Sequence, residues 1–362
     1  MIKISIIAGA RPNFMKIAPI IHEIQRRSEN IIKYRLIHTG QHYDSKMSNT
    51  FFEELNIPEP DVNLNCGGGS QALQTANIMV AFENELLANP ADYVLVVGDV
   101  TSTMACSIVA KKLSTKVIHV EAGIRSGDLR MPEEINRIVT DSLTDVYFTT
   151  TEQASQNLIN LGFDKDRIFL VGNVMIDTLL YNLNRLRKPK IWDSFQLNNG
   201  NYFVLTLHRP SNVDDVNGFS ELLKVISENT GNMPIIFPMH PRTKQNYLNA
   251  GYSFKNIYVV DPMGYLEFNY LVKNAKAVIT DSGGITEETT VLGIPCFTLR
   301  ENTERPETVD IGTNSLIGTD PELVKIALNN FIDGCQKKGS IPEFWDGKSA
   351  TRIIDTILEL NG

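Results

Sequence analysis

The chain has 362 residues, of which 42% are hydrophobic and 21% charged, a composition typical of globular proteins. Its formal net charge of −8 and its sequence pI near 5.4 argue against a general nucleic-acid or membrane-surface binder. No run approaches the roughly 18 apolar residues of a membrane span, and the start "MIKISIIAGARPNF" favours a first strand over a secretion signal.

Short apolar runs alternate with helical patterns along the first half of the chain. Strands are predicted at Ile2–Ile7, Tyr34–His38, Tyr93–Val97, Val117–Val120, Val146–Phe148 and Ile168–Val171. Helices are predicted near Asn13–Arg27, Asp44–Leu55, Ser70–Leu87, Thr101–Leu113, Pro132–Leu143 and Glu152–Leu161. The strands are almost wholly apolar, which suits a parallel sheet covered on both faces, so we expect a doubly wound α/β domain.

The stretch Asn184–Tyr202 interrupts this alternation and is interpreted as a linker or domain boundary. Strands then follow at Phe203–Leu207, Pro234–Phe237, Ile257–Val260, Ala277–Ile279 and Pro295–Thr298. We therefore predict two doubly wound, Rossmann-like domains, residues 1–175 and 176–362, facing a cleft. The last helix, near Ser349–Leu360, can pack on either domain, including back on the first.

Polar side chains directly follow several of these strands, where ligands bind in open parallel sheets. In the first half they stand in "GARPNFMK" with Arg11 and Lys16, "GDVTST" with Asp99, and "HVEAGIRSGDLRMPEEINR" with Glu121 and Glu133. In the second half they stand in "HRPSN" with His208, "MHPR" with His240, and "DSGGITEE" with Ser282 to Glu288. Both halves thus direct polar groups at one predicted cleft.

Each motif also has a purely structural interpretation. Arg11 can lie in a solvated turn, and Asp99 can merely cap the helix near Thr101. Ser282-Gly-Gly284 before a helix suits a phosphate, but is also an ordinary strand-to-helix turn.

Other polar residues favour structural roles. His119 lies inside an apolar strand and is interpreted as a core histidine. Glu133 and Glu134 point about 100° apart on a helix, so we expect one of them to face the cleft. "CGGGS" lacks the Gly-x-Gly-x-x-Gly spacing and is interpreted as a loop. The cysteines Cys66, Cys106, Cys296 and Cys335 are far apart, which predicts reduced thiols in a cytoplasmic protein. No residue spacing supports a metal site.

From the residues alone, we expect a two-domain enzyme that acts on a phosphorylated anion. The joint pattern of "GARPNFMKIAPI", "HTGQHYD", "GDVTST", "HVEAGIRSGD", "MPEEINR", "GNVMIDTL", "LHRPSN", "TDSGGITEE" and "TERPE" resembles the UDP-N-acetylglucosamine 2-epimerase family from about residue 3 to 355. The resemblance implies the two-lobed GT-B architecture and the isomerase activity of the non-hydrolysing type. It implies no cofactor, no metal, a UDP-sugar substrate, and commonly a homodimer.

The chemistry that the resemblance implies is elimination of UDP across carbons 1 and 2 to a 2-acetamidoglucal, followed by re-addition to UDP-N-acetylmannosamine. By motif, Asp99, Glu121 and Glu133 are the acid and base candidates, and His208 stands beside the diphosphate. The choice of base and acid stays open. The substrate-binding candidates are Arg11, Lys16, Arg137, His240, Tyr265, Phe268, Ser282, Gly283, Gly284, Glu288 and Arg305. Of these, Glu288 is expected to accept hydrogen bonds from the ribose.

Two departures from the family pattern concern regulation and substrate. Where many bacterial members have "QHR" and "HRRE", this chain has Gln41-His-Tyr43 and His208-Arg-Pro-Ser211, which puts an allosteric substrate site in doubt. These forms look closer to archaeal members and to relatives that act on modified sugars such as UDP-2,3-diacetamido-glucuronate. That substrate, net hydrolysis, a glycosyltransferase of the same architecture, and a nucleotide-sugar sensor without turnover are the alternatives. The pathway, expected to supply surface polysaccharides, is not encoded in the motifs.

Overall fold

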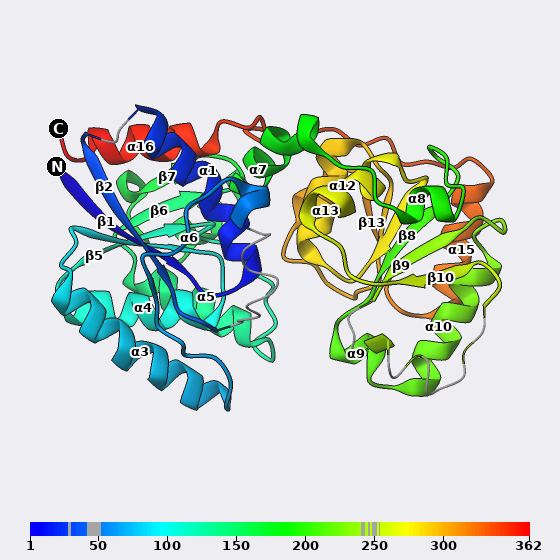
Figure 1. Ribbon diagram of the computed structural model, residues 1–362, viewed down its shortest axis with the longest axis horizontal. Coiled ribbons are helices and arrows are strands. Elements are labelled where there is room, and N and C mark those ends of the chain that lie inside the picture. Colours follow the sequence, from blue (N-terminus) through cyan, green and yellow to red (C-terminus); the bar gives the residue numbers. More distant parts are fainter. Residues whose placement is uncertain (28–29, 42–51, 240–242, 245–246, 248–251, 253) are drawn as a thin grey trace. The chain divides into compact units, whose positions relative to one another are not determined.

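The computed structural model describes residues 1–27, 30–41, 52–239, 243–244, 247, 252 and 254–362 (Figure 1). The chain forms two compact units: Met1–Tyr181 together with Glu343–Gly362, and Asn182–Pro342. The division falls at the end of helix α7 (Val174–Asn182), and the last segment returns to the first unit.

The first unit is built on a sheet of seven described strands in the order β3-β2-β1-β4-β5-β6-β7, all paired in parallel. Their bounds are β1 Ile2–Ala8, β2 Ile32–His38, β3 Val62–Asn63, β4 Tyr93–Val97, β5 Lys116–Val120, β6 Val146–Thr149 and β7 Ile168–Leu170. β4 is buried along its whole length, as expected for a central strand covered on both faces.

Helices connect these strands (Figure 1). They are α1 Arg11–Arg27, α3 Gln71–Ala88, α4 Thr101–Lys112, α5 Pro132–Leu143, α6 Glu152–Asn160, α7 and α16 Ser349–Glu359, with the 3₁₀ helix η1 at Lys165–Arg167. Capping accounts for several of the starts: the side chains of Ser70 and Thr151 accept hydrogen bonds from Leu73 N and Ala154 N at the N-termini of α3 and α6.

The second unit repeats the plan with six described strands in the order β10-β9-β8-β11-β12-β13. They are β8 Phe203–Thr206, β9 Ile235–Pro238, β10 Ile257–Val260, β11 Ala277–Thr280, β12 Cys296–Thr298 and β13 Asn314–Leu316. Its helices are η2 Leu183–Arg185, α8 Ile191–Ser194, α9 Pro210–Val213, α10 Val216–Glu228, α12 Tyr265–Asn274, α13 Gly283–Leu292, α14 Pro306–Asp310 and α15 Pro321–Ile332. The predicted pair of doubly wound sheets is therefore confirmed.

The stretch predicted as a linker packs against the second unit. Trp192, Leu197 and Tyr202 are buried in the same hydrophobic cluster as Val204 of β8. Although the stretch is largely polar in sequence, these three side chains make it part of the hydrophobic core of the second unit. Two short edge strands, β3 and β13, are not predicted from sequence, because two or three residues are too few to show a pattern. The helix predicted at 44–55 lies mostly outside the described residues, and only 52–55 are seen to be helical.

The final helix α16 packs on α1 in the first unit. The buried carboxylate of Asp177 accepts hydrogen bonds from the backbone N–H groups of Ser349 and Ala350, and thereby fixes the start of α16. At the other end of the helix, Arg27 and Asp355 form an ion pair at 2.6 Å. These contacts explain why residues far apart in sequence belong to one compact unit.

Both sheets reverse their strand order once, and each reversal marks a place for a ligand. In the first unit, β1 neighbours both β2 and β4, so the segments after β1 and β4 diverge at the carboxyl edge. In the second unit the same holds for the segments after β8 and β11. The motifs singled out in the sequence lie at these two positions. Within the described residues, no helix is both long and apolar enough to cross a membrane.

Candidate active site

The segment after β1 is held in place by one amide side chain. Asn13 Oδ1 accepts hydrogen bonds from the backbone N–H groups of Gly9 and Ala10, and its Nδ2 donates to the carbonyl of Val97 at the end of β4. The two diverging segments are thus tied together. Arg11 begins helix α1 beside them, and burial lowers the pKa of its guanidinium, while nearby Glu54 acts in the opposite direction.

Two of the predicted site residues, Lys16 and Glu121, meet beyond β4 and β5. Lys16 Nζ lies 2.7 Å from Glu121 Oε2, and both side chains are almost fully buried. A Cβ added to Gly98 would stand 2.8 Å from the same Nζ, so the backbone before Asp99 passes directly over this ion pair. Glycine is favoured there, since Gly98 also has a φ of 66°.

The backbone of Glu121 lies in the left-handed region, with a φ of 71°. That conformation costs roughly 1–2 kcal/mol for a residue with a side chain. It turns the carboxylate sharply at the end of β5 toward Lys16. Local strain of this kind gathers at functional sites, where the surrounding structure holds it.

Asp99 is fixed by an arginine and does not cap α4. Its Oδ2 lies 2.5 Å from Arg137 Nη2, and Asn136 donates to its backbone carbonyl at 2.8 Å. The residue that precedes α4 is Val100, whose side chain makes no capping bond, so the capping interpretation of Asp99 is wrong. With 29% of its side chain exposed, the carboxylate of Asp99 is open to a substrate while Arg137 holds it from the buried side.

Glu133 and Glu134 have different surroundings, as expected for neighbouring residues on a helix: Glu134 is buried and Glu133 is exposed. Glu134 accepts hydrogen bonds from the backbone of Ser126 and Gly127 and pairs with Arg137 at 2.7 Å. Burial alone would raise the pKa of Glu134, but these donors lower it below its usual value. Glu133 is exposed in the first turn of α5. Arg137 is therefore clamped between the carboxylates of Asp99 and Glu134.

His119 is a satisfied core histidine, as predicted. It is fully buried, with its Nδ1 at 2.7 Å from Asp141 and its Nε2 at 2.9 Å from the carbonyl of Gly98. Arg125 also pairs with Asp141 at 2.6 Å. The pair supports the backbone of Gly98, which links the buried histidine to the position of Asp99.

In the second unit, the N-terminus of α13 forms an anion-binding geometry. Ser282 precedes the helix without a side-chain capping bond, and a Cβ added to Gly284 would meet no atom within 4 Å. The buried Nη1 of Arg300 lies 3.8 Å from the Cβ position of Gly283 and has no hydrogen-bond partner in the described part of the chain. Helix N–H groups, open space and an unsatisfied guanidinium nitrogen all favour a bound phosphate.

Acidic partners hold the arginines around this helix. Arg300 Nη2 lies 2.6 Å from Glu304, and the Nε of Arg305 lies 2.6 Å from Glu287. Burial would raise the pKa of Glu304, yet Arg300 and Arg305 lower it to about 2. Arg305 is therefore oriented by α13 itself, within the "TERPE" segment that sequence singled out.

His208 follows β8 and contacts the residue that follows β11. Its Nδ1 lies 2.7 Å from Oδ1 of Asp281, which is fully buried, whereas 60% of the His208 side chain is exposed. The backbone N–H groups of His208 and Arg209 and the amide of Asn212 also donate to Asp281. The carboxylate thus fixes both the loop and the ring.

Glu288 lies two turns along α13 and is fully enclosed. Its Oε1 accepts hydrogen bonds from the Tyr265 hydroxyl at 2.8 Å and from the Asn269 amide at 3.3 Å. Burial raises the pKa of Glu288 to about 7, although these two donors act in the opposite direction. Phe268 is packed against the hydrophobic cluster beneath α12, so its position is set by the core. Tyr265 and Phe268 both lie in the first turn of that helix.

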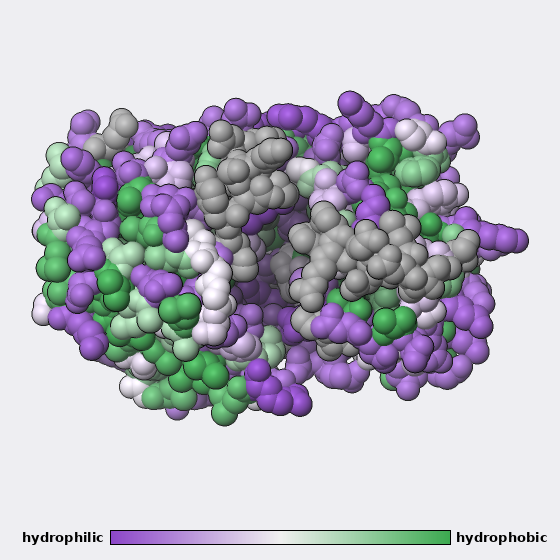
Figure 2. All heavy atoms as spheres, turned by 60° about the horizontal axis from the view of Figure 1, so that its bottom comes forward, coloured by the Kyte–Doolittle hydropathy of each residue, from purple (hydrophilic) through white to green (hydrophobic). Residues whose placement is uncertain are grey.

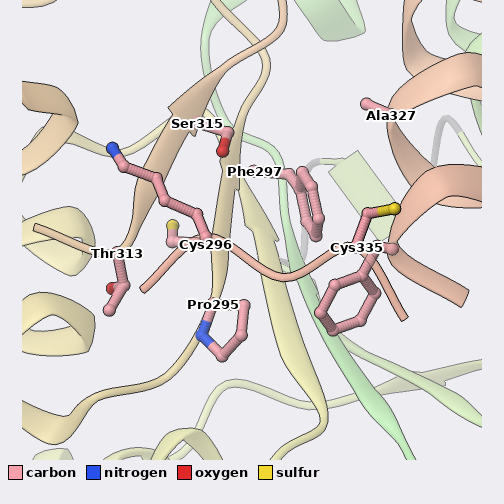
Figure 3. A pocket seen from close by; sticks show the side chains of 9 residues that line it. Pro295, Cys296, Phe297, Thr313, Ser315, Ala327 and Cys335 are labelled. Carbon is pink, nitrogen blue, oxygen red and sulfur yellow. The ribbon is translucent and has the colours of Figure 1, made fainter. Parts of the chain in front are cut away.

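One predicted residue, His240, lies outside the described residues, as do His42 and Tyr43. A cavity of about 150 Å³ elsewhere in the second unit is lined by the β12 residues Cys296 and Phe297, by Ser315 of β13 and by Ala327 of α15 (Figure 3). Cys335 also lines it. None of the predicted site residues lines this cavity. Within the described part of the chain, no three His, Cys, Asp or Glu side chains are grouped as metal ligands.

Two residues of the site escape sequence reasoning. Asp281 lies inside the "TDSGGITEE" motif, where the sequence indicates only the end of a strand. Its contact with the side chain of His208 is seen only in the structure. Arg300 stands after β12 and reads as a surface charge until it is seen to be buried. A charged residue within two positions of the end of a core strand is the signal that could have pointed to both, since Asp281 follows β11 and Arg300 stands two residues after β12.

Comparisons with known proteins agree with this arrangement. A family model described as UDP-N-acetylglucosamine 2-epimerase matches residues 22–358. The UDP-N-acetylglucosamine 2-epimerase of Methanocaldococcus jannaschii is 41% identical to the chain over 367 residues, which covers 97% of this chain and 98% of the relative. A UDP-2,3-diacetamido-2,3-dideoxy-D-glucuronate 2-epimerase of Pseudomonas aeruginosa is 38% identical and covers 99% of this chain and 100% of the relative.

Solved structures give the same answer at the level of the fold. The crystal structure of the M. jannaschii UDP-GlcNAc 2-epimerase in complex with UDP-GlcNAc and UDP matches with a TM-score of 0.89 at 41% identity, and covers 99% of this chain and 100% of that one. A lipopolysaccharide outer core galactosyltransferase at 14% identity, covering 99% of this chain and 100% of its own, matches with a TM-score of 0.57. It shows only the shared fold, which supports the predicted GT-B architecture. The chain belongs to the UDP-N-acetylglucosamine 2-epimerase family.

Proposed function

We propose that this protein interconverts UDP-N-acetylglucosamine and UDP-N-acetylmannosamine without net hydrolysis. The observation that carries the proposal is the paired set of carboxylates and cations after β4 and β5, Asp99 with Arg137 and Glu121 with Lys16. A protein that only bound the nucleotide would need the anion site of the second unit and would not need these groups. Family membership and the M. jannaschii relatives support the same substrate.

The reaction has to overcome the low acidity of the proton at carbon 2, which has no neighbouring carbonyl. In the proposed route a carboxylate removes that proton, the bond from carbon 1 to the phosphate oxygen breaks, and UDP leaves with the electron pair. The resulting 2-acetamidoglucal then receives a proton on its other face at carbon 2, and UDP adds back to carbon 1. This sequence requires proton donors and acceptors and cations that stabilise the departing diphosphate.

In the first unit we assign proton transfer to Asp99, Glu121 and Glu133. The ion pairs of Asp99 and Glu121 supply carboxylates whose positions are fixed. Arg11 and Lys16 supply positive charge on the sugar side. Because Arg137 is buried between Asp99 and Glu134, we propose that it serves the substrate through Asp99.

In the second unit we assign UDP binding to the α13 region. Ser282, Gly283 and Gly284 would hold phosphate oxygens with helix N–H groups, together with Arg300. His208 would stand beside the diphosphate. Tyr265 and Phe268 mark the helix start that would meet the uracil, Glu288 would meet the ribose, and Arg305 and His240 would complete the pocket.

A second candidate substrate is a modified UDP-sugar, because the P. aeruginosa relative is named for UDP-2,3-diacetamido-2,3-dideoxy-D-glucuronate. The same elimination chemistry would apply, with one additional cation to pair with the uronate carboxylate. Incubation of the pure protein with each UDP-sugar, with products separated by anion-exchange chromatography, distinguishes the two. Conversion of UDP-N-acetylglucosamine to its manno epimer supports the proposal, and turnover of the diacetamido-glucuronate alone would replace it.

We also propose that the protein is a homodimer that uses the surface of α3. Leu73, Val80 and Leu87 recur every seven residues along α3 and are all more than half exposed. Ile135 and Ile138 of α5 are exposed as well, and α4 packs against both helices. Figure 2 shows hydrophobic side chains gathered on this part of the first unit. A contiguous apolar surface of this kind typically marks a protein–protein interface.

The dimer proposal predicts the effect of a charge in the middle of the stripe. Val80→Glu should give a monomer in sedimentation-velocity ultracentrifugation at concentrations where the wild type is a dimer. Leu161→Glu serves as the control, because Leu161 is equally exposed but lies at the end of α6. A wild-type monomer, or a dimer that survives Val80→Glu, would reject this surface.

For the cellular compartment we propose the cytoplasm. All four cysteines of the chain are free thiols, and Cys66, Cys106 and Cys296 are buried. Disulfides are common in oxidising compartments and rare in the cytosol.

A further inference from the structure

The loop after β8 and the residue after β11 form an Asp–His pair at the strand-order reversal of the second unit. Asp281 is fully buried beneath the loop, whereas His208 has one face against Asp281 and the rest exposed. The arrangement differs from the buried pair His119–Asp141, in which both ring nitrogens are occupied within the described structure. In His208 only Nδ1 faces a buried partner.

The carboxylate of Asp281 accepts hydrogen bonds from several donors in the segment after β8. Besides His208 Nδ1, the backbone N–H groups of His208 and Arg209 and the amide of Asn212 donate to it. Burial alone would raise the pKa of Asp281, but His208 and the two backbone donors lower it. An ionised carboxylate can only accept hydrogen bonds, so Nδ1 of His208 must carry the proton.

We propose that Asp281 is the positioning residue for His208: it fixes the tautomer with the proton on Nδ1 and directs Nε2 away from the core. The proposal rests on the proposed function, in which His208 acts on the diphosphate. With Nδ1 held by Asp281, Nε2 is the nitrogen that can hydrogen-bond the departing phosphate oxygen or exchange a proton with it.

The residue that contacts His208 belongs to the turn of the proposed anion site. Asp281 immediately precedes Ser282 and the N-terminus of α13, so the residue that orients His208 belongs to the same turn that would hold the phosphate. Thr206 and Thr280, the last residues of β8 and β11, are joined by a hydrogen bond of 2.6 Å between their hydroxyls. The two loops therefore begin at strand ends that are joined by a hydrogen bond, and the Asp281–His208 pair joins the loops a second time.

The first test reads the tautomer directly. Two-bond ¹H–¹⁵N NMR of ¹⁵N-histidine-labelled full-length protein, with the His208 signals assigned by their loss in His208→Gln, is recorded over a pH series. The neutral ring of the wild type should be protonated on Nδ1, and Asp281→Asn should shift it to Nε2, because the amide can donate to Nδ1. A wild-type ring protonated on Nε2 would overturn the proposal, and this outcome needs no variant of Asp281 to fold.

The second test is a double-mutant cycle on turnover, with UDP affinity and thermal unfolding as controls for folding. His208→Gln should lower kcat by about 100-fold, the usual effect of losing one acid–base or oxyanion group. Asp281→Asn should lower kcat by about 10-fold or more, and the double variant should be no slower than His208→Gln alone, within about 2-fold. Effects that multiply would show that Asp281 acts independently of His208 and would overturn the proposal.

Failure of the two claims can be told apart. If His208→Gln leaves kcat unchanged while the ring is protonated on Nδ1, the proposed role of His208 in the reaction is wrong and the positioning by Asp281 stands. If His208→Gln lowers kcat but Asp281→Asn changes neither kcat nor the tautomer, the function stands and the positioning role is rejected.

Discussion

Asp99 shows how one side chain can be both fixed in position and accessible. Arg137 holds it from the core side, and the backbone of Gly98 is fixed by His119. Sequence singled out Asp99 because it follows a core strand, but could not separate the catalytic from the capping interpretation. The structure shows an ion pair between Asp99 and Arg137 of α5, and the catalytic role of Asp99 stays a prediction.

Replacing Asp99 by Asn removes the charge and keeps the shape. We expect turnover of Asp99→Asn to fall below detection, since a neutral amide cannot take or give the proton, while UDP affinity measured by calorimetry stays within a few-fold of the wild type. Arg137 retains Glu134 as a partner, so the fold should persist. Loss of UDP binding together with turnover would show that Asp99 is structural.

Glu288 carries a pH dependence whose sign follows from its burial. Because burial raises its pKa to about 7 from the ordinary value of 4.5, the folded state binds the proton more tightly than the unfolded state. The contribution of Glu288 to the free energy of unfolding should therefore fall as pH rises from about 4.5 to about 7 and then level off. Glu288→Gln should remove this dependence and be more stable than the wild type at pH 8, by at most roughly 3 kcal/mol.

The measurement is urea-induced unfolding of both proteins without ligand at several pH values. Ribose binding should favour the other protonation state of Glu288, because the ribose hydroxyl groups donate hydrogen bonds and an ionised carboxylate accepts them. UDP affinity of the wild type should thus rise between pH 6 and pH 8, and that of Glu288→Gln should not rise to the same extent. Parallel pH profiles for the two proteins would remove Glu288 from the ribose site.

Among the elements, the N-terminus of α13 is a place where one substitution should change protein stability and UDP affinity in different ways. Gly284 lies in the first turn of α13, where an added Cβ meets no atom within 4 Å, and alanine generally favours a helix over glycine by roughly 0.5–1 kcal/mol. We expect Gly284→Ala to unfold at the same temperature as the wild type or higher. Its UDP affinity should fall by about 10-fold or more, because the methyl group occupies the space left for phosphate.

Gly218 offers a matched control in the same unit. It lies in the first turn of α10, where its added Cβ would meet only the end of the Asp215 side chain. Gly218→Ala should leave UDP affinity unchanged. Equal affinities for Gly284→Ala and the wild type would mean that phosphate does not approach this part of the helix.

Most long elements could be predicted from the sequence, because β1, β4, β5 and α4 combine apolar runs with clear starts and ends. The edge strands β3 and β13 could not, being too short to show a period. The role of Asp281 was hidden for another reason: hydrogen bonds between segments about seventy residues apart leave no local trace in a sequence.

At the scale of the whole chain, the sequence indicated two doubly wound sheets but not their strand order. The order matters, because it decides which loops diverge and hence where a ligand can lie. The return of α16 to the first unit depends on Asp177 and on Arg27, which no periodicity reveals. The sequence was sufficient to predict that polar side chains follow the strand ends, whereas the contacts of each side chain could be found only in the structure.

The central claim is that UDP leaves and returns across carbons 1 and 2 of the sugar. It is tested most directly by proton NMR of UDP-N-acetylglucosamine incubated with the pure protein in heavy water. We predict UDP-N-acetylmannosamine that retains UDP and carries deuterium at carbon 2, because the returning proton comes from a group that exchanges with solvent. Free N-acetylmannosamine with UDP, or an epimer that keeps its original hydrogen at carbon 2, would contradict the account.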